Sequence, residues 1–426
     1  MNNPNYIPKK SIEENMNIPQ GYKQTEFGPI PSDWGVCTFQ NVLTTFSSGA
    51  TPYRGIPEYY KGNVRWISSG ELNYNKIFDT IEHISQQAVR NTNLRVHQSG
   101  TFLMAITGLE AEGTRGRCAF VGAPATTNQS CLAINGTERM CTEYLFWFYR
   151  MWGQYLAFKY CQGTKQQSYT ANIVKNLPIY GPKDIAEQKA IAEALGDIDG
   201  LIAALDKKIA KKRLIKQGAM QQLLTGKKRL PGFSDPWVEK KFSDLYRYAS
   251  EGGTPDTNNM RFYANGDVPF VKIEDTETKY IESCNSFITS EGINNSSAWI
   301  VPVNSIIYTN GATIGNVSIN KIPVATKQGI LGIIPSSIIN LEFMYYLLLS
   351  QNFKREVDSR QAKGTFATII LKSLDEIPIY LPLNQMEQIA IATILSDMDK
   401  EIADLEAQRD KYRLLSLIHI SEPTRQ

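Results

Sequence analysis

The sequence predicts an α+β protein in which two duplicated, β-rich globular domains are separated by two long helices. These helices are expected to form an antiparallel coiled coil with pseudo-two-fold symmetry. Three observations lead to this fold class: a segment of the first half recurs in the second half, a heptad pattern of apolar residues runs through each copy, and short β-type runs precede each copy. The repeat period, near 200 residues, is too long for a solenoid and indicates duplicated domains.

The recurring segment is LPIYGPKDIAEQKAIAEALGDID at 177–199, which returns as IPIYLPLNQMEQIAIATILSDMD at 377–399. The offset of 200 holds without a gap through 178–214, where roughly half of the positions are identical. Weaker matches align Trp34 with Trp237 and SSGATP (47–52) with SEGGTP (250–255). The chain is therefore two copies of one unit, each with a variable globular part followed by a constant helix.

Apolar residues at alternating spacings of four and three mark each constant helix. Such a heptad seam needs a partner, and the other copy, running antiparallel, is the simplest one. The first helix is expected from about 184 to 225, with Gly226 as its terminator, which gives a rod of roughly 60 Å. The seam residues are Ile191, Leu195, Ile198, Ile202 and Leu205 in the first copy, and Ile391, Leu395, Met398, Ile402 and Leu405 in the second.

The variable parts contain short apolar runs bounded by Gly, Pro and Asn, which predict strands. These runs are VRWIS, TFLMAI, CAFVG and CLAI in the first copy, and VPFVKI, SIIYTN, GNVSI and GILGII in the second. An aromatic-rich helix follows in each copy, at 142–160 and 341–357. We expect these aromatic side chains to pack on a sheet rather than to stack on nucleic-acid bases.

Composition is that of an ordinary globular protein, with 426 residues, 42% hydrophobic residues and a net charge of +3, which neither demands nor excludes nucleic acid. No apolar run reaches the ~18 residues of a membrane span, and the polar N-terminus has no signal-peptide core, so a cytoplasmic location is expected. Six scattered cysteines without a C-x-x-C pair are interpreted as free thiols.

Domain boundaries follow from the repeat and its flanks. The predicted order is a polar N-terminal segment (1–20), a first globular domain (21–160), a central constant region with a long helix (161–230), a second globular domain (231–360), a second constant region with a long helix (361–415) and an atypical tail (416–426). The match between copies stops after Leu415, where RLIKQGAMQQLLTGKKRL gives way to RLLSLIHISEPTRQ. We interpret the tail as foreign to the repeat and not as native helix.

Catalytic patterns are scarce: the three histidines lack metal-ligand spacing, and neither a Walker A motif nor a nucleotide-binding glycine fingerprint is present. Pro255-Asp256 followed by Glu277-Thr278-Lys279 fits the loose Pro-Asp…Glu-x-Lys pattern of metal-dependent nucleases, in which two carboxylates and a lysine hold Mg²⁺ and orient a water. The first copy has Tyr53 in place of Asp256. A Mg-dependent nuclease using Asp256, Glu277 and Lys279 is therefore kept as an alternative, and a protein-only scaffold as another.

Two related domains at the ends of a stiff helical spacer suit a ligand with two half-sites at a fixed separation, and duplex DNA is the leading candidate. The order of variable and constant segments, with P-I-Y-x-P…E-Q…I-A…L…D-x-D…I and an L-L-T-G-K end, resembles the DNA-specificity (S) subunit of type I restriction–modification systems from about Gly21 to Leu415.

The resemblance implies a subunit without catalytic activity that recognises a bipartite, asymmetric DNA target. Each globular domain would read one half-site in the major groove, while the helices fix the spacer and dock two methyltransferase subunits. Motor-nuclease subunits would complete the complex. The resemblance implies no cofactor in this subunit, because S-adenosylmethionine, ATP and Mg²⁺ belong to the partner subunits.

Loops on a rigid β scaffold usually carry base-reading residues: Arg or Lys for guanine, Asn or Gln for adenine, and acids for cytosine. Four pairs of loops align between the copies but differ in polar content, and they are the predicted DNA-binding loops. Their candidate residues are Thr51, Tyr53, Arg54, Ser68, Ser69, Glu71, Arg115, Arg117, Asn128, Gln129, Lys165 and Gln166 in the first copy, and Thr254, Lys272, Glu274, Asp275, Thr313, Asn316, Lys327, Gln328 and Thr365 in the second.

Overall fold

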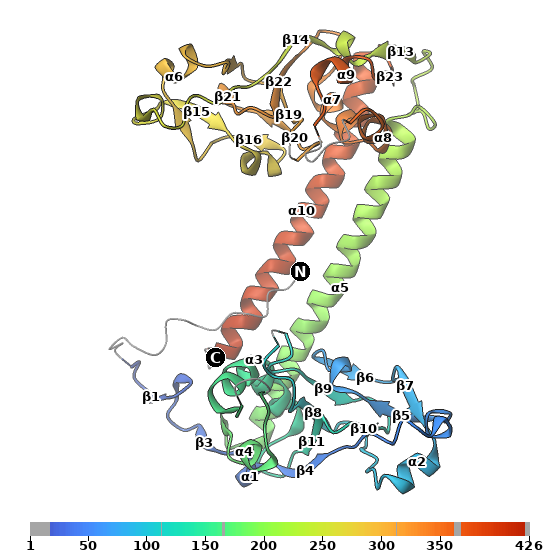
Figure 1. Ribbon diagram of the computed structural model, residues 1–426, viewed down its shortest axis with the longest axis vertical. Helices are drawn as coiled ribbons and strands as arrows, with labels where there is room; N and C mark the ends of the chain where they lie inside the picture. The colour runs from blue at the N-terminus through green and yellow to red at the C-terminus, as the bar shows by residue number, and fades with distance from the viewer. Residues whose placement is uncertain (1–17, 112, 164–166, 312, 362–367, 422–426) are drawn as a thin grey trace. The chain divides into compact units, whose positions relative to one another are not determined.

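Figure 1 shows the computed structural model of the chain, which describes residues 18–111, 113–163, 167–311, 313–361 and 368–421, with only the backbone for 416–421. The described residues divide into two compact units. Unit 1 holds the chain up to Ala204 together with the residues from Arg409 onward, and unit 2 holds Leu205–Gln408. In the described residues no helix is long and apolar enough to cross a membrane.

Unit 1 is built on a five-stranded sheet with the order β4-β11-β8-β9-β6. The four neighbouring pairs are antiparallel except for β6 and β9, which are parallel. The strands are β4 (Thr44–Ser48), β11 (Cys131–Asn135), β8 (Phe102–Ala105), β9 (Cys118–Val121) and β6 (Asn75–Ile77). The runs TFLMAI, CAFVG and CLAI thus form strands as predicted.

A smaller sheet in unit 1 has the order β10-β5-β7, and two further strand pairs flank the domain. Its strands are β10 (Thr126–Thr127), β5 (Val64–Ile67) and β7 (Glu82–Ile84), and the pairs are β1 (Tyr22–Thr25) with β2 (Gly28–Pro31) and β3 (Gly35–Thr38) with β12 (Pro178–Gly181). The helices are α1 (Phe39–Val42), α2 (Gln86–Asn91), α3 (Thr142–Tyr160), α4 (Ala171–Lys175) and the first part of α5 (Ile185–Leu223).

Unit 2 repeats the five-stranded sheet, here with the order β14-β22-β19-β20-β16, and its second sheet has the order β17-β15-β21-β18, with one strand more than the smaller sheet of unit 1. The first sheet contains β14 (Tyr246–Glu251), β22 (Ile330–Pro335), β19 (Ile306–Thr309), β20 (Val317–Asn320) and β16 (Tyr280–Ile281). The second contains β17 (Phe287–Ile288), β15 (Val268–Val271), β21 (Val324–Thr326) and β18 (Ile300–Val301), and β13 (Val238–Lys241) pairs with β23 (Pro378–Leu381). The duplication predicted from the sequence is confirmed.

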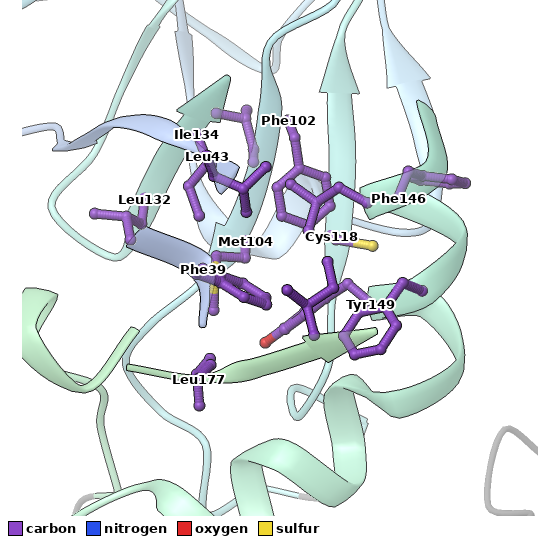
Figure 2. Close-up of a cluster of buried hydrophobic side chains, with 14 of the residues drawn as sticks. Phe39, Leu43, Phe102, Met104, Cys118, Leu132, Ile134, Phe146, Tyr149 and Leu177 are labelled. Carbon is purple, nitrogen blue, oxygen red and sulfur yellow. The ribbon is translucent and has the colours of Figure 1, made fainter. Parts of the chain in front are cut away.

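The core of unit 1 lies between the five-stranded sheet and α3. Figure 2 shows Phe102, Met104 and Cys118 of the sheet gathered with Phe146 and Tyr149 of α3. These side chains are nearly or completely buried. The aromatic residues of α3 therefore pack on the sheet, as expected, because burial of large rings supplies much of the hydrophobic stabilisation of a core.

The aromatic-rich segment of unit 2 differs from the single helix expected at 341–357. It forms two helices, α7 (Leu341–Leu348) and α8 (Gln351–Arg360). Ser350 lies between them in an extended conformation, and its hydroxyl accepts a hydrogen bond from the Phe353 backbone N–H at 3.2 Å. This N-cap starts a new helix and explains the break. The remaining helices are α6 (Ser290–Asn294), α9 (Leu371–Asp375) and α10 (Gln385–Ser421).

The long helices contact each other antiparallel in unit 2. Ile209 of α5 is buried against Ile402 and Leu405 of α10, with Leu205 packed on the same cluster. Ion pairs join Lys212 to Glu401 at 2.6 Å and Lys216 to Asp399, so α10 numbers fall as α5 numbers rise. Beyond the end of α5, Gly226 adopts a φ of +68°, consistent with its predicted role as terminator.

The early part of the predicted seam packs differently from expectation. Ile391 and Leu395 belong to the main core of unit 2, and Leu195 belongs to that of unit 1, with Ile191 packed against it. Met398 packs on the unit 2 core, and Ile198 and Ile202 are half-buried. Thus the first three turns of each helix pack on the core of its own domain, which also contains Ile179 or Ile379 of the preceding Pro-Ile-Tyr strand.

The glutamine of the repeated Glu-Gln pair has the same structural role in both copies. The Gln188 amide donates to Pro182 O at 2.8 Å and to Arg139 O at 2.9 Å, and it accepts from Cys141 N at 2.9 Å. Gln388 binds Pro382 O, Ile338 O and Asn340 N in the same way. Both glutamines are completely buried and use their amide groups to tie the long helix to the start of the preceding aromatic helix.

Candidate nucleic-acid interface

Three of the predicted loops of unit 1 meet at the end of the smaller sheet. The Ala50 N–H donates to Thr127 O at 3.1 Å, and the Asn128 N–H donates to Ile67 O at 2.8 Å. The side chains of Thr51 and Gln129 are hydrogen-bonded to each other. Because β10 and β5 are parallel, the segments that follow them leave the sheet at the same edge.

The remaining loop segments of unit 1 join this edge from the larger sheet. The Ile106 N–H donates to Ser130 O at 2.9 Å, and the Leu109 N–H donates to Gln167 O at 3.0 Å. The Arg115 guanidinium donates to Leu109 O at 2.6 Å and to the Gln167 side chain at 3.2 Å. Gln167, at the end of the 163–167 loop, is thereby bonded to Leu109 and Arg115 of the loop that follows β8.

Unit 2 assembles its loops with equivalent bonds. The Gly253 N–H donates to Thr326 O at 3.0 Å, and the Lys327 N–H donates to Val271 O at 3.1 Å. The Asn316 side-chain amide donates to the Thr276 hydroxyl at 3.1 Å. The two units therefore build the same loop cluster on the same scaffold, mainly through backbone hydrogen bonds.

Several predicted residues present their side chains to solvent in these clusters. Tyr53 is 73% exposed, which is unusual for so large an apolar ring. The other exposed candidates are Thr51, Arg54 and Gln129 in unit 1, and Glu274, Thr313, Lys327 and Gln328 in unit 2. Half-buried candidates that also line the loops are Ser69, Thr254, Lys272 and Asn316.

Arg54 is held on a platform that the sequence reasoning did not identify. Its guanidinium donates two hydrogen bonds of 2.8 Å to Glu82 and lies 4.6 Å from the centre of the Tyr60 ring, with Trp66 beyond. The hydrogen bonds from Arg54 lower the pKa of Glu82 below its ordinary value. A planar guanidinium held in this way keeps a fixed orientation, which suits bidentate recognition.

Other predicted residues hold the loops in shape. The Glu71 carboxylate accepts hydrogen bonds of 2.8 Å from the Ser68 backbone and hydroxyl, and one of 3.0 Å from the Ile81 N–H. Asp275 accepts from the Lys272 N–H at 2.8 Å. Arg117 donates to Gly113 O, and Asn128 accepts from Ser130 N. These side chains form local turns and caps, so we expect them to position the loops.

Close backbone approach at two glycines was a further feature that the sequence reasoning missed. A Cβ atom at Gly49 would lie 1.8 Å from Thr127 O, and one at Gly252 would lie 1.9 Å from Thr326 O. The aligned motifs SSGATP and SEGGTP carried this signal, because both place glycine at the same point of the repeat. Lys165, Gln166 and Thr365 lie outside the described residues.

The residues of the nuclease alternative have other contacts. The Lys279 ammonium pairs with Glu342 at 2.7 Å and lies over the rings of Tyr280, Tyr345 and Tyr346. The Asp256 carboxylate accepts from the Asn258 N–H within its own loop at 3.0 Å. Within the described ranges, no group of three or more His, Cys, Asp and Glu side chains is arranged to hold a metal ion.

The fold and the loop clusters define a class of protein with two related recognition domains joined by long helices. The family model described as "Type I restriction modification DNA specificity domain" matches residues 31–212 and 234–411. The chain therefore belongs to the family of type I restriction–modification DNA-specificity subunits. It is a DNA-sequence-recognition subunit without catalytic activity, and subunits of this family bind DNA in complex with other restriction–modification subunits.

Individual relatives agree with the family match. The chain is 24% identical over 367 residues to the type I restriction enzyme MjaIX specificity subunit of Methanocaldococcus jannaschii, covering 81% of this chain and 82% of that protein. It is 30% identical over 171 residues to the HindI specificity subunit of Haemophilus influenzae, covering 39% of this chain and 37% of that one. The S subunit from M. genitalium has the same fold, with a TM-score of 0.58 at 14% identity, over 92% of this chain and 96% of that chain.

Proposed function

We propose that the chain recognises a bipartite, asymmetric DNA target. Target-recognition domains 1 (21–160) and 2 (231–360) each read one half-site in the major groove with their loop clusters. The long helices set the number of unread base pairs between the half-sites. The observation that carries the proposal is the assembly of equivalent loops, with different side chains, on one repeated scaffold.

The chemistry of the two clusters supports unequal half-sites. Unit 1 offers an oriented guanidinium at Arg54 and the exposed ring of Tyr53, which suit a guanine edge and an apolar contact with a thymine methyl group. Unit 2 has the acidic Asp256 at the position of Tyr53 and offers Lys272, Lys327 and Gln328. Two readers with different donors and acceptors select different bases, so the target is asymmetric.

The partners of this subunit follow from the same proposal. We propose that two methyltransferase subunits dock on the helical region and that motor-nuclease subunits complete the complex. S-adenosylmethionine, ATP and Mg²⁺ are then bound by those subunits. The six free thiols fit a reducing compartment, which supports a cytoplasmic location.

The test is the selection of bound sequences from a random duplex pool by the chain co-expressed with its methyltransferase partner. The expected result is a motif with two short, unequal halves and a fixed gap. Replacement of residues 21–150 by the corresponding part of a related subunit should then change one half and leave the other. A contiguous motif would contradict the two-domain reading, and a well-formed complex without any enrichment would favour the protein-only scaffold.

A further inference from the structure

An Asp-x-Asp motif lies in each long helix, just beyond the turns that pack on the domain core. It comprises Asp197 and Asp199 in α5, and Asp397 and Asp399 in α10. In both copies the first aspartate is exposed and the second is half-buried. Side chains two positions apart lie on different faces of a helix, so the two aspartates of each motif have different surroundings.

In unit 1, Asp199 is joined to the globular domain through Arg150 of α3. The Arg150 guanidinium donates to the Asp199 carboxylate at 2.9 Å. It also lies 4.9 Å from the centre of the Trp147 ring and 5.6 Å from that of the Tyr74 ring. Tyr74 lies between the predicted DNA-binding loop at 68–71 and strand β6. Arg150 thus connects the long helix with the chain that leaves a recognition loop.

In unit 2, Asp399 has an equivalent connection made by different residues. Its carboxylate accepts a hydrogen bond from the Tyr346 hydroxyl of α7 at 2.8 Å, and it is also paired with Lys216 of α5. The Lys279 ammonium donates to the Tyr346 hydroxyl at 3.1 Å and lies over the same ring. Lys279 lies between the predicted loop at 272–275 and strand β16. The same position of the repeat therefore accepts a hydrogen bond from the aromatic helix in both units.

Two attachments determine the direction in which α5 leaves its domain. The first is Gln188, whose buried amide makes three hydrogen bonds to the domain, and the second is Asp199, about 16 Å further along the helix. The last buried residue of α5 in unit 1 is Leu195, only about 10 Å from Gln188. Without the Asp199 bond, the same lateral displacement at the last attachment would swing the helix through a roughly 1.5-fold larger angle. In α10, Gln388 and Asp399 have the same spacing.

The ion pair of unit 1 has the character of a positioning contact. The side chains of Arg150 and Asp199 are 31% and 41% exposed, so their pairing adds little to the stability of the fold. Its effect is on direction, because a planar guanidinium held against two rings has a fixed orientation.

We propose that Asp199 and Asp399 are positioning residues that fix the angle between each recognition domain and its long helix. By holding this angle they make the protein selective for one gap length between the half-sites. The proposal rests on the bipartite recognition proposed above and adds the residues that make the gap exact. Neither aspartate is a base-reading residue, so the bases of the half-sites do not depend on them.

The test starts from the motif that the full chain, in complex with its methyltransferase partner, selects from a random duplex pool. Dissociation constants are then measured for duplexes that carry both half-sites with the selected gap, or with a gap one base pair longer or shorter. We expect the wild type to bind the selected gap roughly 100-fold more tightly, because one base pair displaces a half-site by about 3.4 Å. In Asp199→Ala and in Asp399→Ala this preference should fall to about tenfold or less, with the same half-site bases selected.

The first aspartate of each motif provides the matched control. Asp197→Ala and Asp397→Ala make the same change at an exposed position of the same helix turn and should keep the wild-type gap preference. An unchanged preference in Asp199→Ala would overturn the proposal, as would an equal loss in Asp197→Ala. A uniform loss of affinity at all gap lengths would also overturn it, because that result indicates a merely structural role. A wild-type complex that selects no bipartite motif would instead refute the proposed function, and the positioning role with it.

Discussion

Replacement of Glu387 by glutamine should destabilise unit 2 strongly, because it leaves the Arg229 guanidinium without its counter-charge. Glu387 is completely buried, whereas the Arg229 side chain is 27% exposed. Removal of one partner from a buried pair lowers the free energy of unfolding by about 3–5 kcal/mol. Because Arg229 is partly exposed to solvent, we expect Glu387→Gln to lower it by about 2–3 kcal/mol. The Trp237 indole N–H can still donate to the amide oxygen of the new glutamine, so its hydrogen bond contributes little to the loss of stability.

The repeat provides a matched control in the same molecule. Glu187→Gln makes the same chemical change at the equivalent position of unit 1, where the carboxylate is half-buried and forms no ion pair within the described residues. Glu187→Gln should lower the free energy of unfolding by less than about 0.5 kcal/mol. The comparison separates loss of the buried pair from a general effect of changing a helix N-terminal carboxylate.

The measurement should be local, because a chain with two compact units need not unfold in one step. Hydrogen exchange of peptides covering 220–240 should accelerate roughly 30- to 150-fold in Glu387→Gln, while peptides of unit 1 stay unchanged. Arg229→Gln alone should accelerate exchange in these peptides to a similar degree. The double variant Glu387→Gln/Arg229→Gln should be less destabilised than the sum of the two single changes. The reasoning is refuted if Glu187→Gln costs as much as Glu387→Gln, or if Glu387→Gln costs less than 1 kcal/mol.

Three further predictions concern the recognition loops, acid stability and the helical spacer. Gly49→Ala and Gly252→Ala should each lower the free energy of unfolding by about 1–3 kcal/mol through overpacking, because a Cβ would lie within 2 Å of a backbone carbonyl oxygen. Each change should impair recognition of one half-site, and selection of bound sequences with each variant should show that the other half-site is still recognised. Burial lowers the pKa of His97 to about 4, so the folded protein binds fewer protons than the unfolded chain between about pH 4 and 6.5. The contribution of His97 to the free energy of unfolding should be complete above pH 6.5 and should fall by up to ~3 kcal/mol as the pH drops toward 4. Urea titrations at several pH values should show a weaker pH dependence of this free energy in His97→Gln. Insertion of four residues after Ala204 lengthens α5 by about 6 Å and should widen the recognised gap by roughly two base pairs; new half-site bases with an unchanged gap would contradict the spacer role.

The sequence was informative where the signal is local or repeated. Apolar runs located the strands, and the exact offset between the copies located the long helices, because both depend on spacing along the chain. The break before α8 was missed although Ser350 is a favourable N-cap, since the apolar pattern continues across it. The anchoring of Ile391 and Leu395 in the unit 2 core was missed for a related reason. A heptad pattern shows which face of a helix is apolar, and it does not show which partner covers that face.

The candidate loop residues illustrate the same limit. Ser68 and Glu71 carry donors and acceptors suited to base edges, yet Ser-x-x-Glu is also the pattern of a capping box, and in the structure the glutamate caps the turn. Lys272 and Asp275 repeat this arrangement in unit 2 through the aspartate. Sequence can identify the loops, but a polar side chain that completes a turn and one that faces a ligand have the same residue type.

The way the two units hold their loops explains how they can differ in what they recognise. The bonds that set the loop positions join backbone atoms, as between Ala50 and Thr127 in unit 1 or between Gly253 and Thr326 in unit 2. Backbone bonds of this kind are largely independent of side-chain identity, so position 53 can be tyrosine while its counterpart is aspartate. The scaffold residue Gln188, by contrast, uses its side chain for three buried hydrogen bonds and recurs as Gln388. Change at the recognition surface is therefore inexpensive in stability, whereas the same change at the helix anchors would leave buried polar groups without partners.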